Sequence, residues 1–168
     1  TSIPEPAPRL LAALDDGVAG LRVGIIEELI DYEGIQPDVR LAVEAAATAL
    51  EEAGAKAERV SVPSTVYGLS AYYLITPAEA SSNLARYDGV RYGLRVEDGD
   101  VRAMYERTRR EGFGDEPKRR IMLGTYALSA GYYDAYYGQA QKVRTVIRQE
   151  HAAAFERFDV LVSPTSPT

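Results

Sequence analysis

A strand–helix–strand pattern between residues 21 and 62 constrains the fold of this chain more than any other feature. Leu21–Ile26 is a compact β-branched run, which predicts a buried strand. Pro37 opens an amphipathic helix whose apolar residues recur every three or four positions up to Leu50. Arg59–Val62 then predicts a second strand. Because neighbouring parallel strands need a crossover of this kind, the pattern predicts a βαβ unit in an α/β protein.

The rest of the chain is predicted to be mainly helical. Three prolines among residues 1–8 indicate a linker. We expect helices at Arg9–Ala13, from a cap at Ser64 or Thr65 to Leu84, and at Val101–Glu111, Glu116–Ala130 and Tyr133–Phe158, with a third strand at Asp159–Ser163. Three strands are few for so large a helical layer, so we expect an incomplete sheet.

Composition excludes several classes of function. The absence of cysteine rules out a disulfide scaffold, a zinc–thiolate site and a thiol nucleophile, and the single histidine, His151, leaves little room for a Ser-His-Asp triad. A net charge of −6 disfavours nucleic-acid binding by this chain alone, because phosphate contacts dominate such affinity. No apolar run approaches the roughly 20 residues of a membrane span, and no signal peptide is recognisable. We expect a cytoplasmic protein without a membrane contact.

Two clusters of side chains are candidates for chemistry. Lys118, Arg119 and Arg120 open a predicted helix, where positive charges oppose the helix dipole. Either one of them faces a fixed anion or the basic turn is simply solvated. The second cluster places five of the twelve tyrosines within twelve residues and indicates a partly polar interior or an interface. Its members are Tyr126, Tyr132, Tyr133, Tyr136 and Tyr137.

Other polar residues are interpreted structurally. Ser81 and Ser82 lie within a predicted helix without a glycine elbow, so we interpret them as small packing residues and not as nucleophiles. The glutamates that could be paired for acid–base or metal chemistry are interpreted as a solvated face. They are Glu27, Glu28, Glu51 and Glu52. The residues alone therefore indicate a candidate anion site and no complete catalytic set.

Longer motifs carry a resemblance to a known family. They occur in one order along the chain: Glu79–Gly93, Glu111–Gly114 with Lys118–Gly124, Ser129–Tyr137 with Gln141–Thr145, and Phe158–Pro167. They resemble the amidase signature family, in its branch of tRNA-dependent amidotransferase A subunits, and Leu21–Ile26 resembles a strand of the same branch. The resemblance implies a partial amidase-signature fold, with a few strands of a mixed sheet covered by several helices, in a single partial domain over residues 1–168.

The resemblance also implies an activity for the intact protein. It would be the glutaminase subunit of a Glu-tRNA(Gln) amidotransferase, a heterotrimer with B and C subunits. The ammonia released from glutamine would convert misacylated Glu-tRNA(Gln) into Gln-tRNA(Gln). ATP and Mg would be used by the whole complex, and the tRNA would be bound mainly by the partner subunit. No cofactor or metal site is expected in this chain.

The family's site residues match this sequence only in part. Its catalytic serine, its second serine with a cis peptide and its lysine have no counterpart here, so we expect a middle-to-C-terminal fragment that is inactive by itself. The family's glutamine-binding arginine matches Arg120, and its glutamine-contacting tyrosine matches Tyr72. A guanidinium suits this role because it can hold a carboxylate through two parallel hydrogen bonds.

Two other functions remain open. The chain could derive from a stand-alone amidase that hydrolyses another amide, and an altered setting of Arg120 would point there. It could also be a non-catalytic binding module, a degenerate relative without catalytic residues. A Gly/Ser-rich segment with a lysine upstream of residue 1 would support an enzyme.

Overall fold

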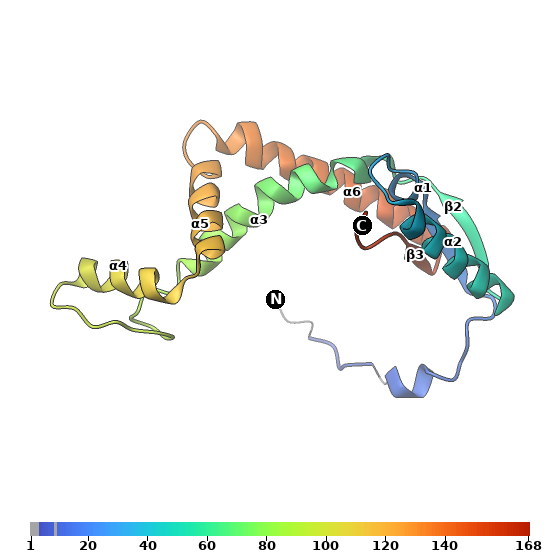
Figure 1. Ribbon diagram of the computed structural model, residues 1–168, viewed down its shortest axis with the longest axis horizontal. Coiled ribbons are helices and arrows are strands. Elements are labelled where there is room, and N and C mark those ends of the chain that lie inside the picture. The colour runs from blue at the N-terminus through green and yellow to red at the C-terminus, as the bar shows by residue number, and fades with distance from the viewer. Residues whose placement is uncertain (1–3, 9) are drawn as a thin grey trace. The chain divides into compact units, whose positions relative to one another are not determined.

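The computed structural model describes residues 4–8 and 10–168, and it divides into two compact units (Figure 1). Unit 1 is Thr1–Pro63 with Glu150–Thr168, and unit 2 is Ser64–Gln149. The predicted linker is described only for Pro4–Pro8, which form neither helix nor strand. Arg9, the first residue of the first predicted helix, lies outside the described residues. The single partial domain over residues 1–168 stays a prediction.

Unit 1 contains a three-stranded sheet in the order β2-β1-β3. The strands are β1 (Arg22–Ile26), β2 (Lys56–Val60) and β3 (Val160–Val162), and β1 pairs in parallel with both neighbours. The remaining elements are the 3-10 turn η1 (Leu10–Ala13) and the helices α1 (Glu27–Ile30) and α2 (Pro37–Glu52). The α/β class and the thin sheet are confirmed. A mixed sheet was expected, whereas the strands of the described residues pair only in parallel.

The second strand begins earlier than its apolar residues suggest. The sequence predicts Arg59–Val62, but β2 starts at Lys56. The reason lies in the turn that ends α2, where Gly54 adopts a φ of 97° and its carbonyl accepts from the Gly20 N–H at 2.8 Å. Lys56 then donates to the Leu21 carbonyl at 2.8 Å, which starts the pairing at once. Backbone pairing therefore extends over polar residues that the hydrophobic pattern does not reveal.

One apolar cluster of unit 1 lies on the face of the sheet to which Gly24 and Ile26 belong. Ile26, Val60, Val62 and Phe158 are almost completely buried and form a single apolar cluster with Ala154. On this face, Gly24 of β1 lies directly against Phe158 and Leu161. A Cβ at residue 24 would lie 2.9 Å from the Phe158 ring and 2.7 Å from the Leu161 side chain. Glycine in the middle of β1 is thus required by packing.

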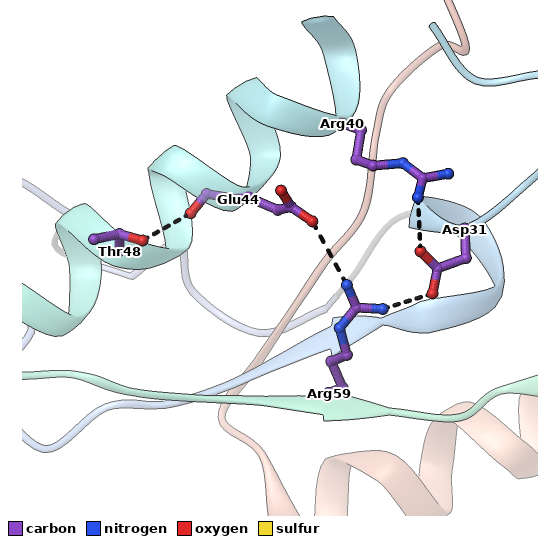
Figure 2. A network of polar contacts seen from close by, with 5 residues as sticks. All are labelled: Asp31, Arg40, Glu44, Thr48 and Arg59. Carbon is purple, nitrogen blue, oxygen red and sulfur yellow. Dashed lines mark hydrogen bonds and ion pairs between the residues drawn. The ribbon is translucent and has the colours of Figure 1, made fainter. Parts of the chain in front are cut away.

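A network of charged side chains joins three elements of unit 1 (Figure 2). Asp31, which follows α1, accepts from Arg40 of α2 at 3.2 Å and from Arg59 of β2 at 2.6 Å. Arg59 also faces Glu44 of α2 at 3.6 Å. All four side chains are between 38% and 47% exposed, so water screens these pairs and each adds little to stability.

The regular elements described in unit 2 are all helical, and a loop over residues 85–100 separates two of them. These elements are the 3-10 turn η2 (Pro63–Tyr67), α3 (Gly68–Leu84), α4 (Val101–Gly112), α5 (Asp115–Ala127), the π-helical turn η3 (Tyr133–Tyr137) and α6 (Gly138–Arg157), whose residues from Glu150 on belong to unit 1. Each predicted helix is present, but two begin differently. A 3-10 turn precedes α3, and a π-helical turn precedes α6. No helix of the described residues is long and apolar enough to cross a bilayer.

Candidate substrate-binding site

Arg120 and Tyr72, the two predicted binding residues, lie together in unit 2. Tyr72 is on α3 and Arg120 on α5, which cross each other (Figure 1). Arg120 Nη1 donates a hydrogen bond to the Tyr72 hydroxyl at 3.0 Å. The neighbouring Tyr73 touches Tyr72 edge to face but has no described contact with Arg120. Of the adjacent pair, Tyr72 is therefore the residue placed beside the guanidinium.

A carboxylate one turn earlier holds Arg120 from the other side. Glu116 Oε1 accepts from Arg120 Nε at 2.9 Å. The hydrogen bond to Tyr72 and the pairing with Glu116 raise the pKa of Arg120 above its usual value, so the group stays charged. A guanidinium has five N–H donors, and these two contacts use one at Nε and one at Nη1, which leaves three N–H groups for a further partner such as a carboxylate. Sequence reasoning missed Glu116, although a glutamate four residues before an arginine is a recognisable helix pair.

The other two cations of the basic turn have different partners. Lys118 Nζ donates to the Arg110 carbonyl at 2.9 Å. Arg119 Nη1 lies 3.9 Å from Glu116 Oε2, and its side chain is 75% exposed. The fixed anion expected near this turn is thus Glu116, a side chain of α5 itself. Of the three, Arg120 is the cation that reaches a side chain of another helix.

A small pocket of about 230 Å³ opens beside Tyr72. It is lined by Gly68, Ala71, Tyr72, Ile75, Thr76, Arg144 and Ile147. Tyr72 belongs both to this pocket and to the pair with Arg120, and Arg144 of α6 is the one arginine among the described lining residues. The surface of this pocket is almost wholly apolar, so it suits an apolar part of a small molecule, and the charged group of Arg120 lies outside its lining. The pocket holds no nucleophile paired with a base among the described residues.

Close contact between α3 and α5 brings the pair together. Gly124 of α5 is buried against Pro77 of α3, and a Cβ at residue 124 would lie 1.9 Å from the Pro77 carbonyl oxygen. The same Cβ would lie 2.8 Å from Ser81 Cβ, and the Ser81 hydroxyl is 2.9 Å from that of Thr125. The interpretation of Ser81 as a small packing residue is confirmed. Ser82, its neighbour, is exposed.

The tyrosine cluster is partly polar and partly open to solvent. Tyr126, Tyr132 and Tyr136 form a run of ring contacts with centroids 4.5 and 5.8 Å apart. Tyr137 instead donates to Glu79 Oε1 at 3.1 Å and accepts from Gln141 at 2.8 Å. Burial of the phenol, opposed by the Gln141 bond and aided by Glu79, raises the pKa of Tyr137. Tyr137 thus joins η3 to α3, while the other four tyrosines of the cluster are at least 37% exposed.

One of the four glutamates assigned to a solvated face is in fact anchored. Glu28 is half-buried and accepts hydrogen bonds from the Ser61 hydroxyl and, at 2.8 Å, from the Val62 N–H. Burial opposes ionisation of this carboxyl, but the two hydrogen bonds outweigh it and lower the pKa of Glu28. The prediction was wrong for Glu28, because the end of β2 supplies donors that a local charge pattern cannot show. Within residues 4–8 and 10–168, no three His, Cys, Asp or Glu side chains gather as metal ligands would.

Comparison with known proteins identifies the class. The family model described as Amidase matches residues 1–168, so the chain belongs to the amidase family. It is 62% identical over its whole length to the A subunit of a Glutamyl-tRNA(Gln) amidotransferase from Rubrobacter xylanophilus, of which it covers 35%. It is 55% identical to the protein of the same name from Thermosynechococcus vestitus, again over the whole chain and 35% of the relative. The chain spans about a third of the length of these relatives, as the resemblance to a fragment implied.

Solved structures agree with this placement. The crystal structure of the A subunit of Glutamyl-tRNA(Gln) amidotransferase from Thermotoga maritima matches 92% of the chain, with a TM-score of 0.61 and 37% identity, and 29% of that protein is covered. A bacterial aryl acylamidase of the amidase signature family matches 94% of the chain with a TM-score of 0.62, and 29% of that enzyme is covered. At 20% identity, the second match shows the fold alone.

Proposed function

We propose that the intact protein is the glutaminase subunit of a Glu-tRNA(Gln) amidotransferase. It hydrolyses glutamine, and its B and C partner subunits use the ammonia to convert Glu-tRNA(Gln) into Gln-tRNA(Gln). The complex uses ATP and Mg for this conversion, and the tRNA is bound mainly by a partner subunit. This chain contributes substrate binding, while the serine–lysine chemistry belongs to residues outside it.

Arg120 and Tyr72 have separate tasks in this proposal. Arg120 holds the α-carboxylate of glutamine through its remaining N–H groups. Glu116 fixes the plane of the guanidinium from the Nε side. Tyr72 orients the same group through its hydroxyl and places its ring along the wall of the adjoining pocket. Together they orient the substrate for attack by a nucleophile that another part of the protein supplies.

The observation that carries the proposal is the hydrogen bond between Arg120 and Tyr72. The two residues are 48 positions apart, and each matches a glutamine-binding position of the family. Their contact at 3.0 Å supports a common role at one site. Identity of 54–62% to several A subunits over the whole chain supports the assignment to this branch of the family.

The direct test replaces Arg120 in the intact protein, assembled with its partner subunits. Arg120→Ala should raise the KM for glutamine on the order of tenfold to a hundredfold, because the carboxylate loses its clamp. Arg120→Lys should also be impaired, because an ammonium cannot reproduce the planar fork. Transamidation driven by free ammonia should be unchanged, since ammonia bypasses the glutamine site.

Arg119→Ala is the matched control. It removes a guanidinium from the next position of the same helix, where the side chain is exposed and makes only a 3.9 Å contact. It should leave both reactions unchanged. Equal loss of the glutamine-driven and ammonia-driven reactions in Arg120→Ala would assign Arg120 to folding or assembly. No change in either reaction would refute the substrate clamp.

The same assay separates this function from a stand-alone amidase. The intact protein should hydrolyse glutamine faster than simple amides that lack an α-carboxylate. The reverse preference would favour the stand-alone amidase. The 168-residue chain alone should release no glutamate from glutamine, because an activated nucleophile and its base are required together.

A further inference from the structure

We infer that Gly124 is a positioning residue of the glutamine site, whose missing side chain allows α5 to approach α3 until Arg120 reaches Tyr72. The inference rests on the proposed function, since it assigns how the clamp of that same site is placed. Gly124 touches no substrate in this scheme. It acts through Arg120, one helical turn earlier on α5.

The space at Gly124 is closed by backbone and not by a movable side chain. A Cβ there would lie 1.9 Å from the Pro77 carbonyl oxygen and 2.4 Å from the Pro77 carbonyl carbon. Ordinary van der Waals contact for such a Cβ starts at 3.4 Å, so the helices would have to separate by about 1.5 Å. A rotamer change cannot relieve this contact, because Pro77 is fixed within α3.

Gly124 has no conformational reason to be glycine. It lies inside α5 with an ordinary helical backbone, and it is absent from the glycines of positive φ. Glycine weakens a helix interior, because it has the most backbone freedom to lose. Its presence at this position is therefore explained by the contact with Pro77.

The close contact lies between two polar contacts that share the same helices. Along α5, the order is Arg120 with Tyr72, Gly124 with Pro77, and Thr125 with Ser81. Separation at Gly124 would lengthen the contact of Arg120 with Tyr72, which now measures 3.0 Å, beyond hydrogen-bonding reach. Arg120 would keep Glu116, because that partner lies on its own helix, and the guanidinium would turn away from α3.

The decisive variant is Gly124→Ala in the intact protein, assembled with its partner subunits. It should raise the KM for glutamine on the order of tenfold to a hundredfold, because a displacement of about 1 Å at a binding group can have effects of this size. The ammonia-driven reaction should be unchanged. Gly138→Ala is the control, since a Cβ at this helical glycine would lie 3.5 Å from its nearest neighbour, the Tyr133 carbonyl oxygen. It should alter neither reaction.

A double variant tests whether Gly124 acts through Arg120. In an Arg120→Ala background, Gly124→Ala should cause no further rise in the KM for glutamine, because the clamp is already absent. Multiplied effects in the double variant would overturn the inference. The inference would also be overturned if Arg120→Ala raises the KM for glutamine and Gly124→Ala leaves it unchanged. That result would leave the proposed function intact. If Arg120→Ala has no effect, the proposed clamp itself fails.

A milder substitution at the same helix contact serves as the test if Gly124→Ala does not fold. Ser81→Val adds volume at the same crossing from α3 and removes the 2.9 Å contact with Thr125. It should raise the KM for glutamine by about threefold without changing the ammonia-driven reaction, as a partial displacement would. Equal loss of both reactions, or no change in the KM, would count against the positioning role.

Discussion

The two units of this chain bury different kinds of side chain. In unit 1, the largest fully buried side chains are Val23, Ile30 and Val62. In unit 2, most buried apolar residues are alanines, at positions 71, 78, 127 and 140. Large apolar residues of unit 2 remain at the surface, including Met122, which is 73% exposed, and Leu69, which is 66% exposed. One unit thus has an apolar core, and the other has closely packed helices with many of their large apolar side chains facing out.

The difference shows how each unit fixes its functional groups. Burial of branched side chains stabilises the sheet of unit 1 whatever polar contacts surround it. In unit 2, the positions of side chains depend on how closely helices approach, as at Gly124 and Pro77, and on polar contacts such as Arg120 with Tyr72. The candidate site lies in this second unit, so its geometry depends on helix spacing more than on a core.

Truncating one large side chain in each unit should give the largest difference. Phe158→Ala should destabilise the sheet by about 3–5 kcal/mol, because Phe158 is 3% exposed and packs over β1. Met122→Ala should change stability by less than about 0.5 kcal/mol, since its side chain is in solvent. Hydrogen exchange of the β1 and α5 amides in the 168-residue chain measures both. Comparable losses would show that Met122 packs against other residues of this chain.

The sequence predicted the elements of both units better than their ends. The run at Leu21–Ile26 and the helix that begins at Pro37 are confirmed, because burial on one face leaves a periodic pattern. The start of β2 at Lys56 was missed, because backbone pairing and the turn at Gly54 determine it. The π-helical turn at Tyr133–Tyr137 was also missed, since such turns are rare and short.

The candidate site was predictable in part. Arg120 and Tyr72 came from motif resemblance, and periodicity alone would not have paired residues on two separate helices. The roles of Glu116 and Gly124 needed the structure. Glu116 carries a local signal, its spacing of four from Arg120, whereas nothing near Gly124 in the sequence reveals that Pro77 lies against it. Contacts between helices are fixed by tertiary packing, and local patterns do not record them.

A loop of unit 2 should depend on a buried carboxylate for its stability, whereas the sheet of unit 1 depends on buried apolar side chains. Asp88 is 7% exposed, and its carboxylate accepts from the N–H groups of Val90 at 2.9 Å and Arg91 at 3.3 Å. The hydrogen bond from Val90 is the main cause that lowers the pKa of Asp88, ahead of the Arg91 contacts. Asp88→Ala should speed proteolysis of the loop before α4 on the order of tenfold, because the loop opens more often.

Asp88→Asn is the matched variant for that loop. It keeps a side-chain oxygen for the two N–H groups and loses only the charge that pairs with Arg91 at 3.2 Å. Proteolysis should therefore stay close to the rate of the unaltered protein. If both variants are cleaved at the same increased rate, the ion pair and not the hydrogen bonds holds the loop.

The smallest effect is expected for an exposed pair at the start of the neighbouring strands β1 and β3. Asp159 accepts from the Arg22 side chain at 2.6 and 3.0 Å and from the Arg22 N–H at 2.9 Å. These hydrogen bonds, with the side-chain ones largest, lower the pKa of Asp159 from 3.8 to about 2. A carboxyl with a lowered pKa adds stability above its unfolded value and loses it as the pH falls through its folded value. The contribution should therefore be complete above pH 3.8 and disappear towards pH 2.

Asp159→Asn should remove this part of the pH dependence and leave the rest. Salt at about 1 M should reduce the difference between the variant and the unaltered protein, because both side chains are exposed. Urea unfolding between about pH 5 and about pH 2 measures it. Parallel loss of stability in the variant and the unaltered protein across that range would show that other carboxyls dominate acid unfolding.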